Sequence, residues 1–160
     1  MQAQANGIHP TKPQEHTIKS ANYDIVAQNH SSFNFHIEYY KKDGNAVDLT
    51  GYTAQLRVIP NTNQAYSYLE VSTGGVTGGG ATGEFLAGVV GKSGVGGSGG
   101  IYMNQNEAGS GSLTGGILIS VDATTMSYMP QGRWLYELDL INNDTIKELL
   151  MGAFTVTARV

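Results

Sequence analysis

The sequence predicts an all-β fold, organised as a single antiparallel β-sandwich. Short segments alternate between polar and apolar residues with a period of two, and clusters of turn-forming residues separate these segments. No segment carries a sustained helical period. At 160 residues, the chain is expected to form one sandwich domain over residues 21–160, preceded by an extended arm over residues 1–20.

The arm is expected to be extended because Pro10 and Pro13 lack a backbone donor and disfavour helix. Such an arm can fray or can lie on a neighbouring subunit, and the residues leave both alternatives open. Residues 1–6 have neither a basic nor an apolar stretch, so we expect no secretory signal. No run approaches the roughly 18 apolar residues of a membrane helix.

Turn signals divide the remaining chain into short strands. Asp43-Gly44 predicts a tight turn because glycine supplies a positive φ, and residues 142–144 predict another. Asp122 is placed to cap one helical turn, and Gly152 marks a possible β-bulge within the last strand pair. The expected strands are residues 32–39, 52–59, 66–71, 116–121, 133–140, 146–150 and 153–160.

About seven strands in one domain of this length indicate a sandwich of immunoglobulin type. Buried large apolar side chains contribute roughly 1.5–3 kcal/mol each, so a set of about ten suffices for one small core. The expected core residues are Phe33, Phe35, Ile37, Leu56, Val58, Trp134, Tyr136, Leu138, Phe154 and Val156.

Residues 74–116 hold seventeen of the 22 glycines and only three charged residues. Glycine has no side chain to bury and loses much backbone entropy on ordering, so the segment is interpreted as a long inserted loop. We expect contacts with neighbouring subunits to order it, with pairing as extra strands left open, and we expect its deletion to impair assembly while leaving the sandwich folded. The candidate interface residues of the arm and the insertion are Ile8, Pro10, Pro13, Phe85, Leu86, Val89, Val90, Ile101 and Tyr102.

Composition argues against several function classes. Charged residues make up 14% of the chain and the net charge is −4, which disfavours non-specific nucleic-acid binding. The absence of cysteine excludes disulfides and thiolate metal sites. Strings resembling a P-loop (residues 91–93), a dinucleotide fingerprint (94–99) and a nucleophile elbow (96–100) lack the strand and helix context that each needs. We therefore assign no catalytic, cofactor or metal residues and expect no enzyme.

The polar residues have structural explanations. The four histidines show no metal-ligand spacing, and His36 is expected on the outward face of its strand. Turn chemistry accounts for Asp43 and Asp48 without a bound cation. Glu137 and Asp139 are expected on a solvated outer face rather than as an acid–base pair. The nine tyrosines fit core and interface positions equally well.

Two parts of the chain resemble a known family. Residues 42–57 read KDGNAVDLTGYTAQLR, and the later strings are GRWLYELDL at 132–140 and LLMGAFTV at 149–156. These strings resemble small tailed-phage virion proteins with the immunoglobulin-like N-terminal domain of baseplate upper proteins. The resemblance covers about residues 30–72 and 116–160; the long arm and the glycine-rich insertion depart from it. It implies an immunoglobulin-like fold and a virion setting, and it carries over no site residues.

These observations together favour a non-enzymatic bacteriophage structural protein, a homo-oligomeric assembly module of the tail, neck or baseplate. Its expected partners are copies of itself and other virion proteins, with no cofactor, nucleic acid or membrane. A capsid decoration protein that bridges lattice neighbours is one alternative. A receptor- or carbohydrate-binding module that uses the glycine-rich loop is the other, although that segment is poor in aromatic and amide groups.

Overall fold

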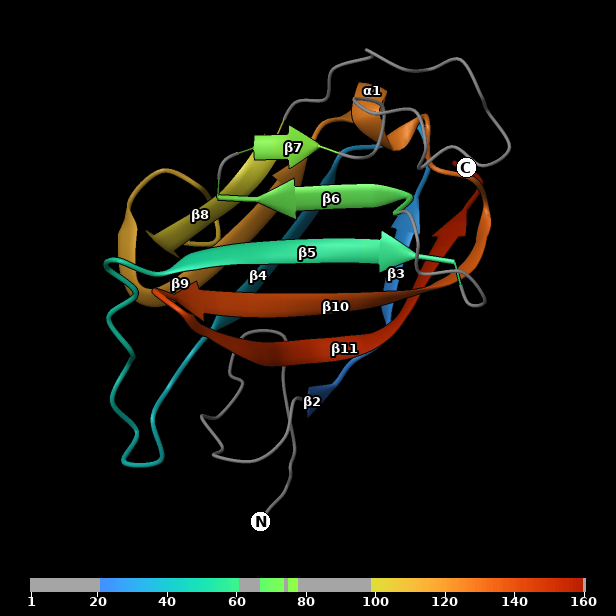
Figure 1. The fold of residues 1–160 in the computed structure, drawn as a ribbon. Helices are drawn as coiled ribbons and strands as arrows, with labels where there is room; N and C mark the ends of the chain where they lie inside the picture. Colours follow the sequence, from blue (N-terminus) through green and yellow to red (C-terminus); the bar gives the residue numbers. More distant parts are fainter. Residues whose placement is uncertain (1–20, 61–66, 74, 78–98, 160) are drawn as a thin grey trace.

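The structure is a computed structural model that describes residues 21–60, 67–73, 75–77 and 99–159. These residues form two β-sheets with almost no helix, so the all-β prediction is confirmed. Figure 1 shows the sheets as two layers, with the larger sheet in front. The described residues form ten strands, more than the roughly seven expected. No helix in this part of the chain is long and apolar enough to cross a membrane.

The larger sheet has the strand order β2-β11-β10-β5-β6-β7, and β3 also pairs with β11. β2 and β3 run parallel to β11, whereas the other neighbours in this sheet are antiparallel. Its strands are β2 (Ala21–Asn22), β3 (Ile25–Gln28), β5 (Thr53–Ile59), β6 (Leu69–Ser72), β7 (Gly75–Thr77), β10 (Gly132–Asn142) and β11 (Thr145–Thr157).

The smaller sheet has the order β4-β9-β8 and is antiparallel throughout. Its strands are β4 (Phe33–Glu38), β8 (Gly99–Gln105) and β9 (Ser112–Val121). The single-turn helix α1 (Ala123–Met126) joins β9 to β10. The predicted cap is confirmed, since Asp122 Oδ1 accepts a hydrogen bond from the Thr125 N–H at 2.8 Å.

The last two expected strands are one continuous strand, β11. The turn before it is confirmed, with Asn143 at a φ of 55°. The bulge expected at Gly152 is wrong, because the register shift lies at Leu149, between the pairs Leu138↔Leu150 and Asp139↔Glu148. Gly152 instead makes room for another segment, since a Cβ there would lie 2.4 Å from the Tyr23 carbonyl oxygen.

The core lies between the two sheets. Eight of the ten expected core side chains are buried, and Phe35 and Trp134 pack against the core while partly exposed. The alternating strands β4, β5 and β10 supply most of the expected set because period-two alternation directs every second side chain inward. Tyr39, Leu49 and inward residues of β3, β6, β8 and β9 also belong to the core.

The glycine-rich segment is not an insertion over its whole length. Its C-terminal part forms β8 and the first half of β9, and Ile101 is only 2% exposed. The expectation that residues 99–116 lie outside the sandwich is therefore wrong. Glycine there allows close packing: a Cβ at Gly116 would lie 2.1 Å from the Gln105 carbonyl oxygen. Residues 78–98 lie outside the described residues.

His36 does not face solvent, contrary to expectation. Only 7% of it is exposed, and its Nε2 lies 2.9 Å from the Gln105 carbonyl oxygen. The β8–β9 connection returns over the outer face of the smaller sheet, where Gly109 also lies close to the side chain of Leu118. This connection buries a strand face that the alternation alone assigns to solvent. The Nδ1 atom of His36 is buried without a hydrogen-bond partner among the described residues.

Candidate interaction surface

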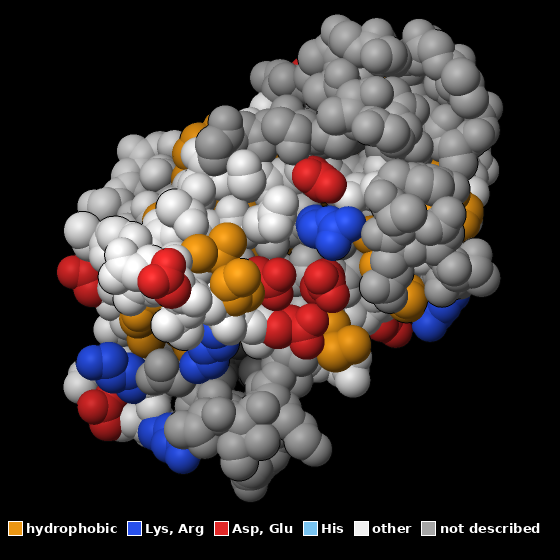
Figure 2. All heavy atoms as spheres, in the orientation of Figure 1, with side chains coloured by type: hydrophobic (Ala, Val, Ile, Leu, Met, Phe, Trp, Pro, Cys, Tyr) orange, Lys and Arg blue, Asp and Glu red, His pale blue; other side chains and the backbone are white. Residues whose placement is uncertain are grey.

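Charged side chains gather on the outward face of the larger sheet (Figure 2). Strand pairing explains the grouping, since Arg57 of β5 lies opposite both Glu137 of β10 and Glu70 of β6. Asp139 of β10 lies opposite Glu148 of β11 in the same way. We call these five residues the charged cluster of the outer face.

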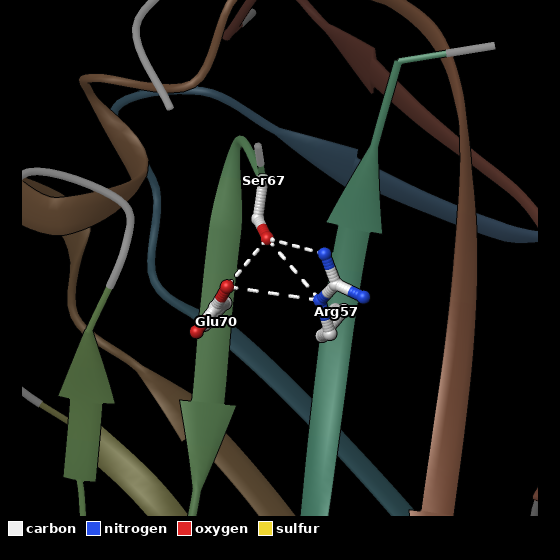
Figure 3. Close-up of polar contacts among 3 residues, drawn as sticks. All are labelled: Arg57, Ser67 and Glu70. Atoms are coloured by element: carbon white, nitrogen blue, oxygen red, sulfur yellow. Dashed lines mark hydrogen bonds and ion pairs between the residues drawn. The ribbon is translucent and has the colours of Figure 1, made fainter. Parts of the chain in front are cut away.

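Arg57, Ser67 and Glu70 form a connected polar network (Figure 3). The Arg57 Nε and Nη2 atoms donate to Ser67 Oγ at 3.3 and 3.2 Å, and Ser67 Oγ donates to Glu70 Oε2 at 2.6 Å. Arg57 Nε lies 3.6 Å from the same carboxylate oxygen. Both charged side chains are partly exposed, so this ion pair contributes little stability by itself. Its main effect is to fix the Arg57 guanidinium toward β6.

Three carboxylates on β10 and β11 lie on the other side of Arg57. Burial, together with the charges of Glu137 and Glu148, raises the pKa of Asp139 to about 6, although the charge of Arg57 opposes this shift. Glu137 and Asp139 do point outward, as predicted, but both are half-buried rather than fully solvated. Among the described residues, no group of three or more His, Asp or Glu side chains is arranged to hold a metal ion.

Apolar side chains border the charged cluster on two sides. Leu135 and Met151, each 41% exposed, lie at one end of the outer face. Ile146, 66% exposed, pairs with Ile141 at the other end. Exposed apolar side chains that lie together on one face can contact another protein. The outer face is therefore chemically suited to contact another protein.

The sequence contained a partial signal for this surface. Leu135 and Ile141 occupy outward positions of an alternating strand, where polar residues are expected.

The predicted interface residue Ile101 belongs to the core, so that prediction is wrong. Its neighbour Tyr102 is 47% exposed on β8 of the smaller sheet. The other predicted interface residues, Ile8, Pro10, Pro13, Phe85, Leu86, Val89 and Val90, lie outside the described residues.

The expected turn chemistry of the aspartates is confirmed. Asp48 Oδ1 accepts hydrogen bonds from the backbone N–H and hydroxyl of Thr50, at 3.0 and 2.7 Å, and from Asn104 Nδ2 at 3.0 Å. The Thr50 and Asn104 donors hold the pKa of Asp48 below its ordinary value. Asp43 Oδ1 likewise accepts from the Asn45 N–H at 2.9 Å. Both carboxylates stabilise the connection between β4 and β5.

A groove of about 410 Å³ separates β3 from β4, at the edge of the sandwich where the chain passes between the sheets. Tyr23 and Phe35 stack in it with ring centroids 5.7 Å apart, and Phe33 lies 6.3 Å from Phe35. Val26, on β3, is 68% exposed and also lines the groove. The groove therefore combines aromatic and aliphatic surface at one edge of the fold.

No family model matches the chain, and no curated protein matches its sequence.

Proposed function

We propose that this chain is a non-enzymatic structural protein of a bacteriophage particle, an assembly module of the tail, neck or baseplate. The outer face of the larger sheet carries the assembly role in this proposal. Its half-buried carboxylates are bordered by exposed Leu135, Ile146 and Met151, a combination that suits contact with further protein subunits. The resemblance of residues 42–57, 132–140 and 149–156 to phage virion proteins supports the virion setting.

We also infer an immunoglobulin-like topology of the variable type. The order β4-β9-β8 corresponds to strands B, E and D, and the order β11-β10-β5-β6-β7 corresponds to G, F, C, C′ and C″. Trp134 Nε1 donates to the Pro130 carbonyl oxygen at 2.9 Å, near the start of β10. This hydrogen bond resembles the tyrosine corner at the start of strand F. The chain lacks the cysteines that link B and F in antibody domains.

The assembly role is tested by sedimentation velocity of the full chain over a range of concentrations. We expect the protein to self-associate through the outer face. The double variant Leu135→Asp/Met151→Asp should self-associate more weakly than the natural chain, with an unchanged circular dichroism spectrum, because it places charge on the apolar border. Leu113→Asp is the matched control, since Leu113 is also exposed but lies on β9 of the smaller sheet.

A wild-type chain that stays monomeric at the highest concentration contradicts the proposed homo-oligomer. Self-association that the double variant leaves unchanged contradicts the choice of this surface.

A further inference from the structure

The groove between β3 and β4 has two strand edges on its sides. Within the described part of the chain, β3 pairs only with β11 and β4 pairs only with β9. Each strand therefore has one edge without a partner strand in this part of the structure. An edge strand directs alternate N–H and C=O groups outward, where they can bind an extended peptide. The groove thus has a peptide-binding geometry.

The groove's side chains favour a particular kind of peptide. The partly exposed rings of Tyr23 and Phe35 supply aromatic surface, and exposed Val26 supplies an aliphatic rim. Asp24 adds a carboxylate whose Oδ1 also accepts from the Ala153 N–H at 3.0 Å. Aromatic grooves bind proline-containing extended segments, because proline lowers the entropy lost on binding. A nearby carboxylate favours a basic residue within that segment.

Residues 1–20 of this same chain contain such a segment. Pro10-Thr11-Lys12-Pro13 places two prolines at the spacing of proline-rich ligands, with a lysine between them and Ile8 just before. We propose that the groove of one copy binds the proline-containing arm of a second copy. This proposal rests on the proposed homo-oligomeric assembly and names the contact that links neighbouring copies.

Chain direction and arm length favour a second copy over the same chain. Ala21 and Asn22 pair with Leu150 and Met151 of β11, whereas β3 pairs further along β11, with residues 154–157. An arm joined at Ala21 would therefore have to turn back along β11 to enter the groove of its own chain. Pro10 lies eleven residues before Ala21, so an extended chain between them reaches about 36 Å, whereas a domain of this size has a radius of gyration of about 15 Å. The arm is thus long enough to cross onto a neighbour. Two copies can exchange arms symmetrically, which closes a dimer.

Cysteine cross-linking tests the contact directly, because the natural chain contains no cysteine. One full-length variant carries Thr11→Cys, activated as a mixed disulfide with thionitrobenzoate. A second carries Gln28→Cys at the rim of the groove. Mixing the two variants should release thionitrobenzoate and give a covalent dimer. This reaction should be at least about tenfold faster than the reaction of the activated Thr11→Cys variant with a Glu107→Cys control, because the two sulfur atoms have a millimolar effective concentration in the complex. Glu107 is exposed in the β8–β9 connection.

A third variant tests the contribution of an exposed groove side chain without changing the core. Val26→Asp, added to the Gln28→Cys chain, changes only an exposed side chain of the groove and should abolish the rate advantage. Equal rates for the Gln28→Cys and Glu107→Cys partners overturn the proposal. So does a Thr11→Cys/Gln28→Cys double variant that oxidises only to a monomer, since its own arm then fills the groove.

Sedimentation separates this proposal from the one on which it rests. Failed cross-linking in a chain that still self-associates overturns only the arm contact. Failed cross-linking in a monomeric chain overturns the proposed assembly as well.

Discussion

Replacing Asp139 by asparagine tests the electrostatics of the outer face. Burial and the charges of Glu137 and Glu148 raise the pKa of Asp139 from 3.8 to about 6. Because the folded pKa lies above the unfolded one, the folded protein holds a proton that the unfolded chain releases between these two values. The ionised carboxylate therefore destabilises the fold fully above about pH 6 and does not do so below about pH 4. Asp139→Asn should remove this penalty.

The size of the effect follows from the pKa shift. A shift of about two units corresponds to about 3 kcal/mol for a group fully shielded from water. Asp139 is only half-buried, so solvent screening reduces the expected gain to about 1 kcal/mol at about pH 7.5. In a chain of this size, that gain raises the melting temperature by about 2–4 °C.

Thermal denaturation followed by circular dichroism, at about pH 7.5 and about pH 4, measures this difference. Asp144→Asn is the matched control, because it removes one carboxylate from the exposed turn of the same hairpin. The reasoning is refuted if Asp139→Asn destabilises the protein near neutral pH, or if it gives the same gain at both pH values.

Four further variants test the packing by urea denaturation. Gly116→Ala should lower the free energy of unfolding by at least about 2 kcal/mol, since a Cβ would lie 2.1 Å from the Gln105 carbonyl oxygen. Gly44→Ala, with open space at a φ of +90°, should cost only about 1 kcal/mol, and equal costs would contradict this packing. Asn104→Ala should cost about 2–4 kcal/mol, because Asn104 Oδ1 accepts from two backbone N–H groups at 3.1 Å; a loss below about 1 kcal/mol would count against this role. Deleting residues 99–116 should abolish cooperative unfolding, because β8 and half of β9 are lost, and a cooperative transition in that variant would exclude these strands from the core.

Strand alternation could be predicted because it is a local property. The segments around Phe33 and Tyr136 alternate between polar and apolar residues, and the inward side chains of both segments pack in the core. His36 could not be placed this way, because Gln105, a residue 69 positions further along the chain, covers it. Ile101 was misplaced for a related reason: glycine content indicated a loop, whereas glycines there let neighbouring backbones approach closely.

The exposure of Met151 on the outer face depends on the register between β10 and β11, which the sequence does not specify. The extra residue at Leu149 shifts the register, so that Leu150 turns inward and Met151 turns outward. A bulge at Gly152, as the sequence suggested, would give these two side chains the opposite faces. The exposed apolar border at Met151 therefore becomes visible only when the register of β10 and β11 is known.

Immunoelectron microscopy tests the proposed virion role most directly. Under this proposal a phage encodes the chain. Antibodies against the chain would be applied to purified particles of that phage, with gold-labelled secondary antibody to mark their position. The account predicts regular labelling at the tail, neck or baseplate, whereas labelling spread over the capsid would support the decoration-protein alternative. Particles that infect normally and carry neither label nor chain, as judged by mass spectrometry, would contradict the structural role.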